Sequence, residues 1–287
     1  MHSEPLDLHH KEILYNRLRA ISIRLSEFSF ANLYLFRKTH GYEVVHDGDC
    51  IHITGFTGDK QKFVLPLCEK KEPDLEHIDE LLDNYEMIFP VCDCWLRYFD
   101  PRNFDIHHNE DDSDYIYTVE KMATYSGRHL SKKRNLLKQF NNSHQYTRQI
   151  LNKDNIEIAI KVLTNWQDET PADASDTDFH AAMEALENME ILGLFGFLYI
   201  IDDKPGAYVL GEDITDDTFV LHFAKGLTEF KGVYQFMYND LAKEIQGKYN
   251  YINFEQDLGL QSLRQAKSSY KPDHMGMKYR IKRRRCN

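Results

Sequence analysis

The sequence lacks the signatures of several common protein classes. Its longest apolar run, residues 191–201, falls far short of the roughly 20 residues that a membrane helix needs. The first ten residues show no cationic segment followed by an apolar segment, so we expect no secretory signal and a cytoplasmic location. Glycine-rich phosphate loops, nucleotide fingerprints and Ser-His-Asp spacing are also missing. These absences argue against the best-known nucleotide-binding and serine-hydrolase chemistries.

Cysteine is scarce, and its five occurrences have no framework spacing: Cys50, Cys68, Cys92, Cys94 and Cys286. We therefore expect reduced, buried thiols. Cys92 and Cys94 are two residues apart, but a zinc site needs four ligands and no second pair lies near them. The acidic loop at 107–112, which also holds two histidines, is more typical of a solvated loop than of a cation site. The sequence predicts no metal site.

Charge and length are ordinary for a globular protein. The 287 residues can bury roughly 75% of the unfolded surface and suffice for one large domain or two small ones. A net charge of -11 argues against general affinity for nucleic acids, but cations cluster at 128–138 and at 278–285. Such clusters can bind phosphates, although a basic C-terminal tail is more often a solvated end.

Periodic patterns predict strands and helices in two similar series. The first series has a helix over 8–25, a hairpin over 42–56 around Asp47-Gly48, a strand near 61–69, a helix from Asp74, a strand over 87–91, a short helix and a strand over 115–120. The second has helices from residue 154 and over 179–189, a hairpin around Lys204-Pro205-Gly206, a strand over 217–226, a helix over 233–245, a strand from Tyr249, a helix from Leu260 and a last strand, HMGMKYRI. The shared order predicts a duplicated α/β unit, with domains 1–124 and 151–287 joined by a basic helix within 125–150.

The stretch 249–279 is the most informative part of the chain. An apolar strand runs out into Glu255, Gln256 and Asp257, and Gly259 then permits a turn. The helix that follows carries a cationic stripe that includes Arg264 and Lys267. Carboxylates at a strand tip beside a cationic helix suggest a site for an anionic ligand. Ordinary surface ion pairs account for the same charges.

Four motifs together closely resemble the family named for the C-terminal domain of phosphatidylglycerol lysyltransferase. They are SEFSFANLYLFR at 26, SGRHLSKKRNLLKQF at 126, VLHFAKGLTEFKGVYQFMYNDLA at 220 and YINFEQDLGLQSLRQAKSSYKPDHMGMKY at 251. The resemblance covers nearly the whole chain. It implies an α/β (α+β) fold of two tandem GNAT-like domains, with mixed sheets flanked by helices. The family is related to the Fem-type transferases.

The resemblance implies an aminoacyltransferase whose donor substrate is aminoacyl-tRNA, bound through the tRNA 3′ end, with no separate cofactor. In the namesake enzymes, which carry a large membrane-embedded half, the acceptor is phosphatidylglycerol. Here the acceptor is open among a lipid head group, a peptide and a small molecule. Two other functions stay open: a GNAT-type acyl-CoA N-acyltransferase, which would use a coenzyme A thioester, and a non-catalytic protein that binds an anionic ligand.

Acyl transfer needs a base, a donor to the oxyanion and a proton for the leaving oxygen. Glu255 is the candidate base. Arg264 and Lys267 are candidate oxyanion stabilisers, and Tyr270 is a candidate acid. Each has a structural alternative, an ion pair for the charged groups and packing for Tyr270.

The candidate substrate-binding residues gather in the basic helix, at the start of the helix at 233 and on two strands. They are Lys132, Lys133, Arg134, Asn135, Lys225, Lys231, Gly232, Tyr234, Gln235, Asn253 and Asp257. By resemblance to GNAT folds, backbone amides at 231–234 would hold donor phosphates, with Gly232 allowing a close approach. A coenzyme A enzyme would show a second small residue at Tyr234, so this departure favours a different donor.

Overall fold

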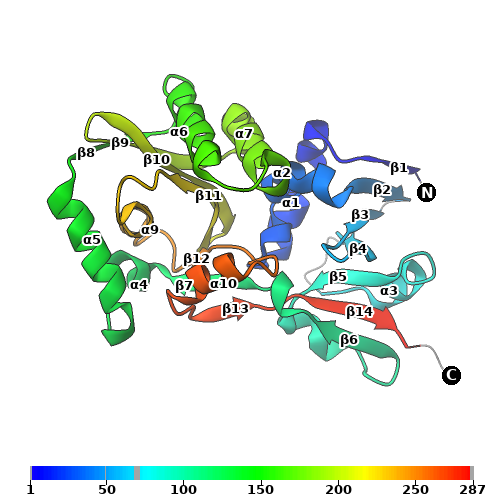
Figure 1. Ribbon diagram of the computed structural model, residues 1–287. Coiled ribbons are helices and arrows are strands. Elements are labelled where there is room, and N and C mark those ends of the chain that lie inside the picture. Colours follow the sequence, from blue (N-terminus) through cyan, green and yellow to red (C-terminus); the bar gives the residue numbers. More distant parts are fainter. Residues whose placement is uncertain (1, 49, 68–71, 285–287) are drawn as a thin grey trace. The chain divides into compact units, whose positions relative to one another are not determined.

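The computed structural model describes residues 2–48, 50–67 and 72–284, which form two compact units (Figure 1). Unit 1 comprises Met1–Tyr115, Glu255–Gln265 and Met275–Asn287, and unit 2 comprises Ile116–Phe254 and Ala266–His274. The units are therefore not consecutive blocks of the sequence. The domain boundaries proposed above, at 124 and 151, stay a prediction.

The first sheet has seven strands in the order β1-β2-β3-β4-β5-β14-β6. The strands are β1 (His2–Pro5), β2 (Glu43–Asp47), β3 (Cys50–Phe56), β4 (Lys62–Pro66), β5 (Met87–Val91), β14 (Tyr279–Arg283) and β6 (Phe104–His108). Only the β4–β5 pair is parallel among the pairings described for this sheet, so the sheet is mixed. The predicted hairpin around Asp47-Gly48 is confirmed as β2–β3, with Gly48 at a φ of 59°.

Three α-helices and several short 3-10 helices accompany the first sheet and form for local reasons. The α-helices are α1 (Lys11–Ile21), α2 (Phe30–His40) and α3 (Leu75–Leu81), and the 3-10 helices include η1 (Leu8–His10) and η2 (Ser26–Phe28). Helix α1 buries Leu14, Leu18 and Ile21, which lie on one helical face. Helix α2 begins where the Ser29 hydroxyl accepts the Asn32 amide, at 3.0 Å.

The second sheet has the order β13-β7-β12-β11-β10-β9-β8. Its strands are β13 (His274–Gly276), β7 (Asp114–Thr118), β12 (Tyr251–Asn253), β11 (Thr218–Gly226), β10 (Lys204–Thr215), β9 (Phe195–Ile201) and β8 (Tyr146–Ile150). Its helices are α4 (Val119–Thr124), α5 (Ser131–Ser143), α6 (Ile156–Glu169), α7 (Phe179–Glu187), α8 (Met189–Leu192) and α9 (Val233–Ile245), and α10 (Gln261–Ser268) has residues in both units. Strands β11 and β12 are parallel and pair over only three residues, 218–220 with 251–253.

Two strand predictions need correction. The β9–β10 turn lies at Asp202 and Asp203, both at positive φ, and not at 204–206. Aspartate tolerates the left-handed region, and the Asp202 carboxylate accepts the Gln145 amide at 2.9 Å, which stabilises the turn there. The segment HMGMKYRI is two strands, not one, because β13 belongs to the second sheet and β14 to the first.

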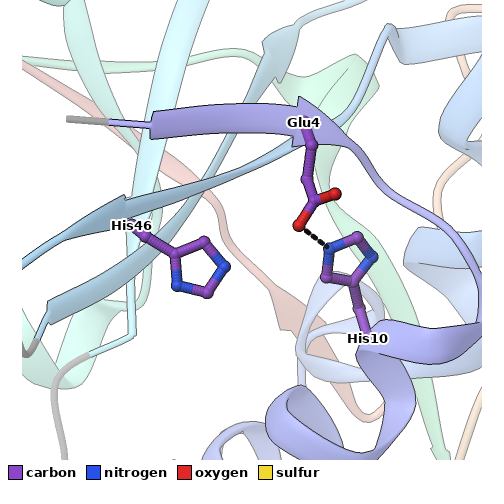
Figure 2. Close-up of side chains that lie close together, drawn as sticks. All are labelled: Glu4, His10 and His46. Atoms are coloured by element: carbon purple, nitrogen blue, oxygen red, sulfur yellow. Dashed lines mark ion pairs between the residues drawn. The ribbon is translucent and has the colours of Figure 1, made fainter.

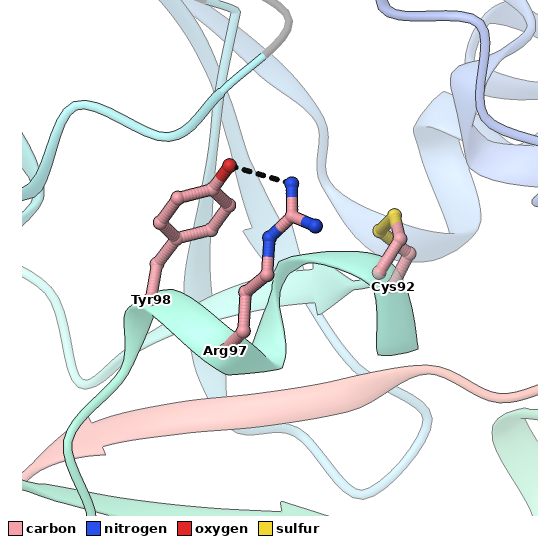
Figure 3. Close-up of a disulfide and its surroundings, with 4 residues drawn as sticks. Cys92, Arg97 and Tyr98 are labelled. Atoms are coloured by element: carbon pink, nitrogen blue, oxygen red, sulfur yellow. Dashed lines mark hydrogen bonds between the residues drawn. A yellow bond between two sulfur atoms is a disulfide. The ribbon is translucent and has the colours of Figure 1, made fainter.

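The expectation of reduced thiols is wrong for Cys92 and Cys94, which form a disulfide (Figure 3). Their Cα atoms are 5.3 Å apart at the start of a 3-10 helix (Asp93–Tyr98), within the range that a disulfide spans. Cys50 is a free thiol, and Cys68 and Cys286 lie outside the described residues. In the described part of the chain, no helix has both the length and the apolar character needed to cross a bilayer.

The residue before α9, Gly232, supports the packing of unit 2. A Cβ placed on Gly232 would lie 2.6 Å from the carbonyl oxygen of Leu136 in α5, and its φ is +91°. The rings of Phe140 in α5 and Phe236 in α9 stack with centroids 4.3 Å apart. Gly232 therefore lets α5 and α9 approach closely.

We expect Gly232→Ala to destabilise the protein more than Gly247→Ala does. Both glycines have a similar positive φ, so alanine pays about 1–2 kcal/mol of backbone strain at either site. No described atom lies within 4 Å of a Cβ at Gly247. At position 232 the alanine Cβ would clash with the Leu136 carbonyl oxygen, which costs roughly 1–3 kcal/mol more. Urea denaturation of the two variants measures the difference. Equal losses of unfolding free energy would contradict the packing role.

Candidate functional site

The loop that follows β12 holds the predicted strand-tip residues. Glu255 has a φ of 58°, in the left-handed region, which is uncommon for a residue with a side chain. Its half-buried carboxylate accepts a hydrogen bond from Asn32 Nδ2 at 2.9 Å. Its backbone carbonyl accepts the Tyr115 amide at 3.2 Å. Asn32 and Tyr115, both in unit 1, thus fix the side chain and the backbone of Glu255.

Asp257 anchors the same loop from a fully buried position. Arg264 binds both of its carboxylate oxygens, with Nε to Oδ2 at 2.8 Å and Nη2 to Oδ1 at 3.0 Å. Tyr115 Oη donates to Oδ2 at 2.7 Å, and the Gly259 amide donates to Oδ1 at 2.9 Å. Burial raises the pKa of Asp257, but the hydrogen bonds from Arg264 and Tyr115 outweigh burial and leave that pKa lowered.

Arg264 also binds Asp111 Oδ1 at 2.5 Å, so its guanidinium joins two carboxylates of unit 1. Because these bonds occupy both Nε and Nη2, they fit a residue that positions the loop. They do not favour the candidate role of Arg264 as an oxyanion stabiliser, which stays a hypothesis.

The buried ammonium of Lys278 contacts the same loop. Lys278 is fully buried, and its Nζ lies 2.7 Å from Asp114 Oδ1 and 2.7 Å from Glu27 Oε1. It also donates to Ser26 Oγ and to Gln256 Oε1, each at 3.1 Å. The Gln256 contact ties the residue after Glu255 to this cluster. All five of these residues belong to unit 1.

The Lys278 cluster contains one carboxyl group that titrates near neutral pH. Burial raises the pKa of Glu27 to about 7, against the opposing effect of Lys278 and with a further increase from Asp114. Burial alone would lower the pKa of Lys278, but the two carboxylates outweigh it and raise that pKa. Two carboxylates and one ammonium leave a net negative charge in a buried place, so a proton on Glu27 neutralises the cluster.

Sequence reasoning missed Ser26, Glu27, Asn32 and Asp114, and it counted Lys278 in a basic tail expected to be solvated. That expectation is wrong for Lys278, and also for Arg280, which is 6% exposed and binds Asp112 and Asp59. A usable signal was present at 26–32, where Ser, Glu and Asn interrupt an aromatic and aliphatic segment. Polar residues inside such a segment need buried partners.

Tyr270 lies in an aromatic cluster of unit 2 and is 3% exposed. Its ring contacts those of Tyr117, Tyr125 and Tyr238, and its hydroxyl accepts a hydrogen bond from Gln235 Nε2 at 2.9 Å. Burial raises the pKa of Tyr270, so the phenol keeps its proton at neutral pH. These contacts fit the packing alternative for Tyr270, and a phenol held this way can still donate a hydrogen bond.

Three other candidates, Lys133, Lys267 and Asn253, also lie in unit 2. Lys133 Nζ lies 3.8 Å from the centre of the Tyr270 ring, and burial lowers the pKa of Lys133. The backbone carbonyl of Lys267 accepts a hydrogen bond from Tyr117 Oη at 2.7 Å, and the Lys267 side chain is half-buried. Asn253 is fully buried in β12 between β7 and β11.

The remaining substrate-binding candidates of unit 2 differ in exposure. Lys225 is 4% exposed, forms a 2.5 Å ion pair with Asp178 and lies 3.6 Å from the centre of the Trp166 ring. Burial lowers the pKa of Lys225, and Asp178 opposes this effect. Arg134 donates to the Gly127 carbonyl at 2.6 Å and to the Tyr125 carbonyl. Lys132, Asn135 and Lys231 are exposed.

The start of α9 differs from the expected phosphate site. The Val233 amide already donates to the Phe230 carbonyl at 3.0 Å. The space beside Gly232 is taken by Leu136, as described above. Tyr234 is half-buried, and burial raises its pKa. These contacts leave little room for a pyrophosphate at Gly232.

Two groups of side chains in the described part of the chain have metal-ligand spacing. One includes Cys92 and Cys94, which the disulfide occupies. The other is Glu4, His10 and His46, which the sequence analysis did not identify.

The model of the family described as "Phosphatidylglycerol lysyltransferase, C-terminal" matches residues 19–282. A conserved protein of unknown function from Bacteroides thetaiotaomicron is 25% identical, with a TM-score of 0.83 over 98% of this chain and 99% of that chain. L-PGS from Bacillus licheniformis is 13% identical, with a TM-score of 0.57 over 88% and 91%. FemX is 10% identical, with a TM-score of 0.56 over 98% and 97%. Among the curated proteins none matches.

These likenesses bear on the fold. The predicted α/β class, with two GNAT-like mixed sheets flanked by helices, is confirmed by the two seven-stranded sheets and by the fold shared with FemX. At 10–13% identity, L-PGS and FemX share the fold and carry no residue roles over to this chain.

We expect Glu27 to make stability depend on pH. Its pKa rises from 4.5 to about 7 on folding, so its contribution is fully present below pH 4.5 and is lost as the pH rises through about 7. Relative to Glu27→Gln, which stays neutral, the wild type should lose up to about 3 kcal/mol of unfolding free energy over this range. Chemical denaturation at a series of pH values measures the loss, with the exposed Glu76→Gln as control. Parallel pH profiles for wild type and Glu27→Gln would contradict the assignment.

Proposed function

Because the chain belongs to the family of the phosphatidylglycerol lysyltransferase C-terminal domain, as its motifs predicted, we propose that it transfers an aminoacyl group from aminoacyl-tRNA to an amine or hydroxyl acceptor. The observation that carries the proposal is the pre-organised Glu255 loop. A half-buried carboxylate is held in the left-handed region by Asn32 and Tyr115, while Asp257 and Gln256 fix the residues that follow it. A carboxylate at a fixed position is what a general base requires.

In the proposed reaction the acceptor nitrogen or oxygen attacks the ester carbonyl of the aminoacyl group. A new C–N or C–O bond forms, and the bond between the carbonyl carbon and the tRNA ribose oxygen breaks. Glu255 takes the proton that the acceptor loses and then gives it to the leaving ribose oxygen, so the carboxylate is regenerated. Asp257, Arg264 and the Lys278 cluster act as positioning residues, because their contacts are with the loop.

Within unit 2, Tyr270 and Lys267 stay candidates for hydrogen bonding to an oxyanion. A phenol with a raised pKa is a poor acid, so it keeps its proton and donates a hydrogen bond instead of releasing the proton. This role replaces the candidate role of Tyr270 as an acid. The Lys267 ammonium supplies a positive charge for the same purpose.

For the tRNA phosphates we propose Lys132 and Lys231, with Asn135 as a neutral neighbour on α5. These side chains are exposed, and α5 packs against the start of α9 through Leu136 and Gly232. Lys133, Arg134 and Lys225 stay candidates for substrate binding, but each has a described partner inside unit 2, so we propose a positioning role for them instead. Phosphate contacts of this kind make affinity depend steeply on salt.

The close approach of α5 at Gly232 disfavours the coenzyme A alternative. A pyrophosphate cradle needs open space and available amides beside the glycine, and here the Leu136 carbonyl fills the space while Phe230 engages the Val233 amide. Calorimetry with acetyl-CoA tests this alternative, and heat of binding at micromolar ligand would favour it over aminoacyl-tRNA.

We expect Glu255→Gln to lower kcat for aminoacyl transfer by about 10²–10⁴-fold while leaving tRNA affinity unchanged, because only the proton acceptor is lost. The assay supplies a pool of tRNA charged with labelled amino acids and offers amines, peptides and phosphatidylglycerol vesicles as acceptors. Glu76→Gln, on an exposed turn of α3, should retain full activity. If the wild type neither transfers label nor binds charged tRNA at low salt, the proposed function fails.

We expect Lys132→Ala and Lys231→Ala to weaken tRNA binding and each to reduce the slope of log affinity against log salt by about 1. Lys153→Ala removes an equally exposed charge from unit 2 outside this group and serves as the matched control. Filter binding at several salt concentrations gives the slopes. The same slope in all three variants would show that the phosphates bind elsewhere.

A further inference from the structure

Glu4, His10 and His46 converge from three elements of unit 1 (Figure 2). Glu4 comes from β1, His46 from β2 and His10 from η1, and one ligand atom of each lies within 4.8 Å of the others. Glu4 Oε1 and His10 Nε2 are 3.2 Å apart. Two ligands of a tetrahedral zinc ion are separated by about 3.3 Å when each bond is about 2.0–2.1 Å. The spacing of this pair already fits such an ion.

His10 is the most informative member because it is 1% exposed and its Nε2 makes no hydrogen bond among the described residues. Glu4 is the ion-pair partner of this nitrogen at 3.2 Å, and the pair makes no well-aligned hydrogen bond. A buried imidazole nitrogen is better satisfied by an aligned partner. The nitrogen points toward Glu4, so a cation between the two would satisfy it.

The other ring nitrogen of His10 can adopt the state that metal binding requires. Nδ1 lies 3.0 Å from the Asp7 amide and 3.2 Å from the Asp7 carbonyl. With Nδ1 protonated, the ring donates to the Asp7 carbonyl and presents the lone pair of Nε2 to an ion, as histidine ligands usually do. With Nε2 protonated, Nδ1 accepts the Asp7 amide and completes the cap of η1. Metal binding therefore exchanges one backbone contact for the other.

The β1–β2 register adds a further histidine to the same face. His2 lies directly opposite His46, so both side chains point to the side of the sheet that carries Glu4. His2 is therefore a candidate for a fourth ligand. Imidazole and carboxylate ligands in this number suit zinc and related divalent transition metals, whereas magnesium prefers oxygen ligands.

We propose that Glu4, His10 and His46 form a zinc-class metal site. The ion would join β1, an edge strand of the first sheet, to β2 and to the turn that leads into α1. Because β1 contributes only four residues to the sheet, such a link would hold the edge in place. The proposal is independent of the aminoacyl-transfer function.

Equilibrium dialysis against Zn²⁺ after removal of bound metal tests the site. We expect one tightly bound zinc per chain, a higher thermal midpoint with zinc than with Mg²⁺, and a visible Co²⁺ spectrum typical of four-coordinate geometry. Glu4→Gln and His46→Ala, both at partly exposed positions, should weaken zinc binding by at least about 10–100-fold.

His129→Ala removes an exposed histidine from unit 2 and is the control for histidine number. It should bind zinc as tightly as the wild type. If Glu4→Gln and His46→Ala bind zinc like the control, or if the wild type binds no zinc, the site does not exist. Circular dichroism of each variant without metal confirms that it is folded, so weaker binding can be attributed to the lost ligand.

Discussion

The contact on which unit 1 most depends is the buried ammonium of Lys278. It touches Asp114 at the start of β7, Ser26 and Glu27 in η2, and Gln256 in the loop after β12. These segments are distant in the chain, and a desolvated charge is stable only when all its partners are in place. The cluster is therefore stable in only one arrangement of the four segments. Because Gln256 belongs to it, this arrangement also fixes the position of Glu255.

Local patterns were sufficient to predict most elements, whereas burial of charge was not predictable from them. The Asp47-Gly48 hairpin and the helix begun by Asp74 follow from residues adjacent in the sequence, and both are confirmed. Lys278, Arg280 and Lys282 alternate with Tyr279 and Ile281, as residues of a strand do, but the hydroxyl partner of Lys278, Ser26, precedes it by 252 positions. Nothing near residue 278 signals that partner, so the sequence favoured a solvated tail.

In the candidate site too, local features were predictable from the sequence, and the pairing of charges was not. A strand tip rich in carboxylates was enough to single out Glu255 and Asp257, because apolar strands end where polar loops begin. Which cation binds which carboxylate depended on tertiary placement: Arg264 binds Asp257 and Asp111. Lys225 likewise looked available for a ligand, but α6 and α7 enclose it with Trp166 and Asp178. A single sequence specifies the charges, and the packing of distant elements decides which of them reach a substrate.

The position of β14 also has a consequence for biosynthesis. This strand pairs with β5 on one side and β6 on the other, so the two strands are joined by residues 279–283, which follow both of them by more than 170 positions. While the ribosome is still making the chain, β5 and β6 each expose a strand edge without its partner. Although β5 and β6 are made before unit 2, their sheet is therefore completed only after unit 2 has been made. Until then their exposed strand edges are what chaperones would need to shield.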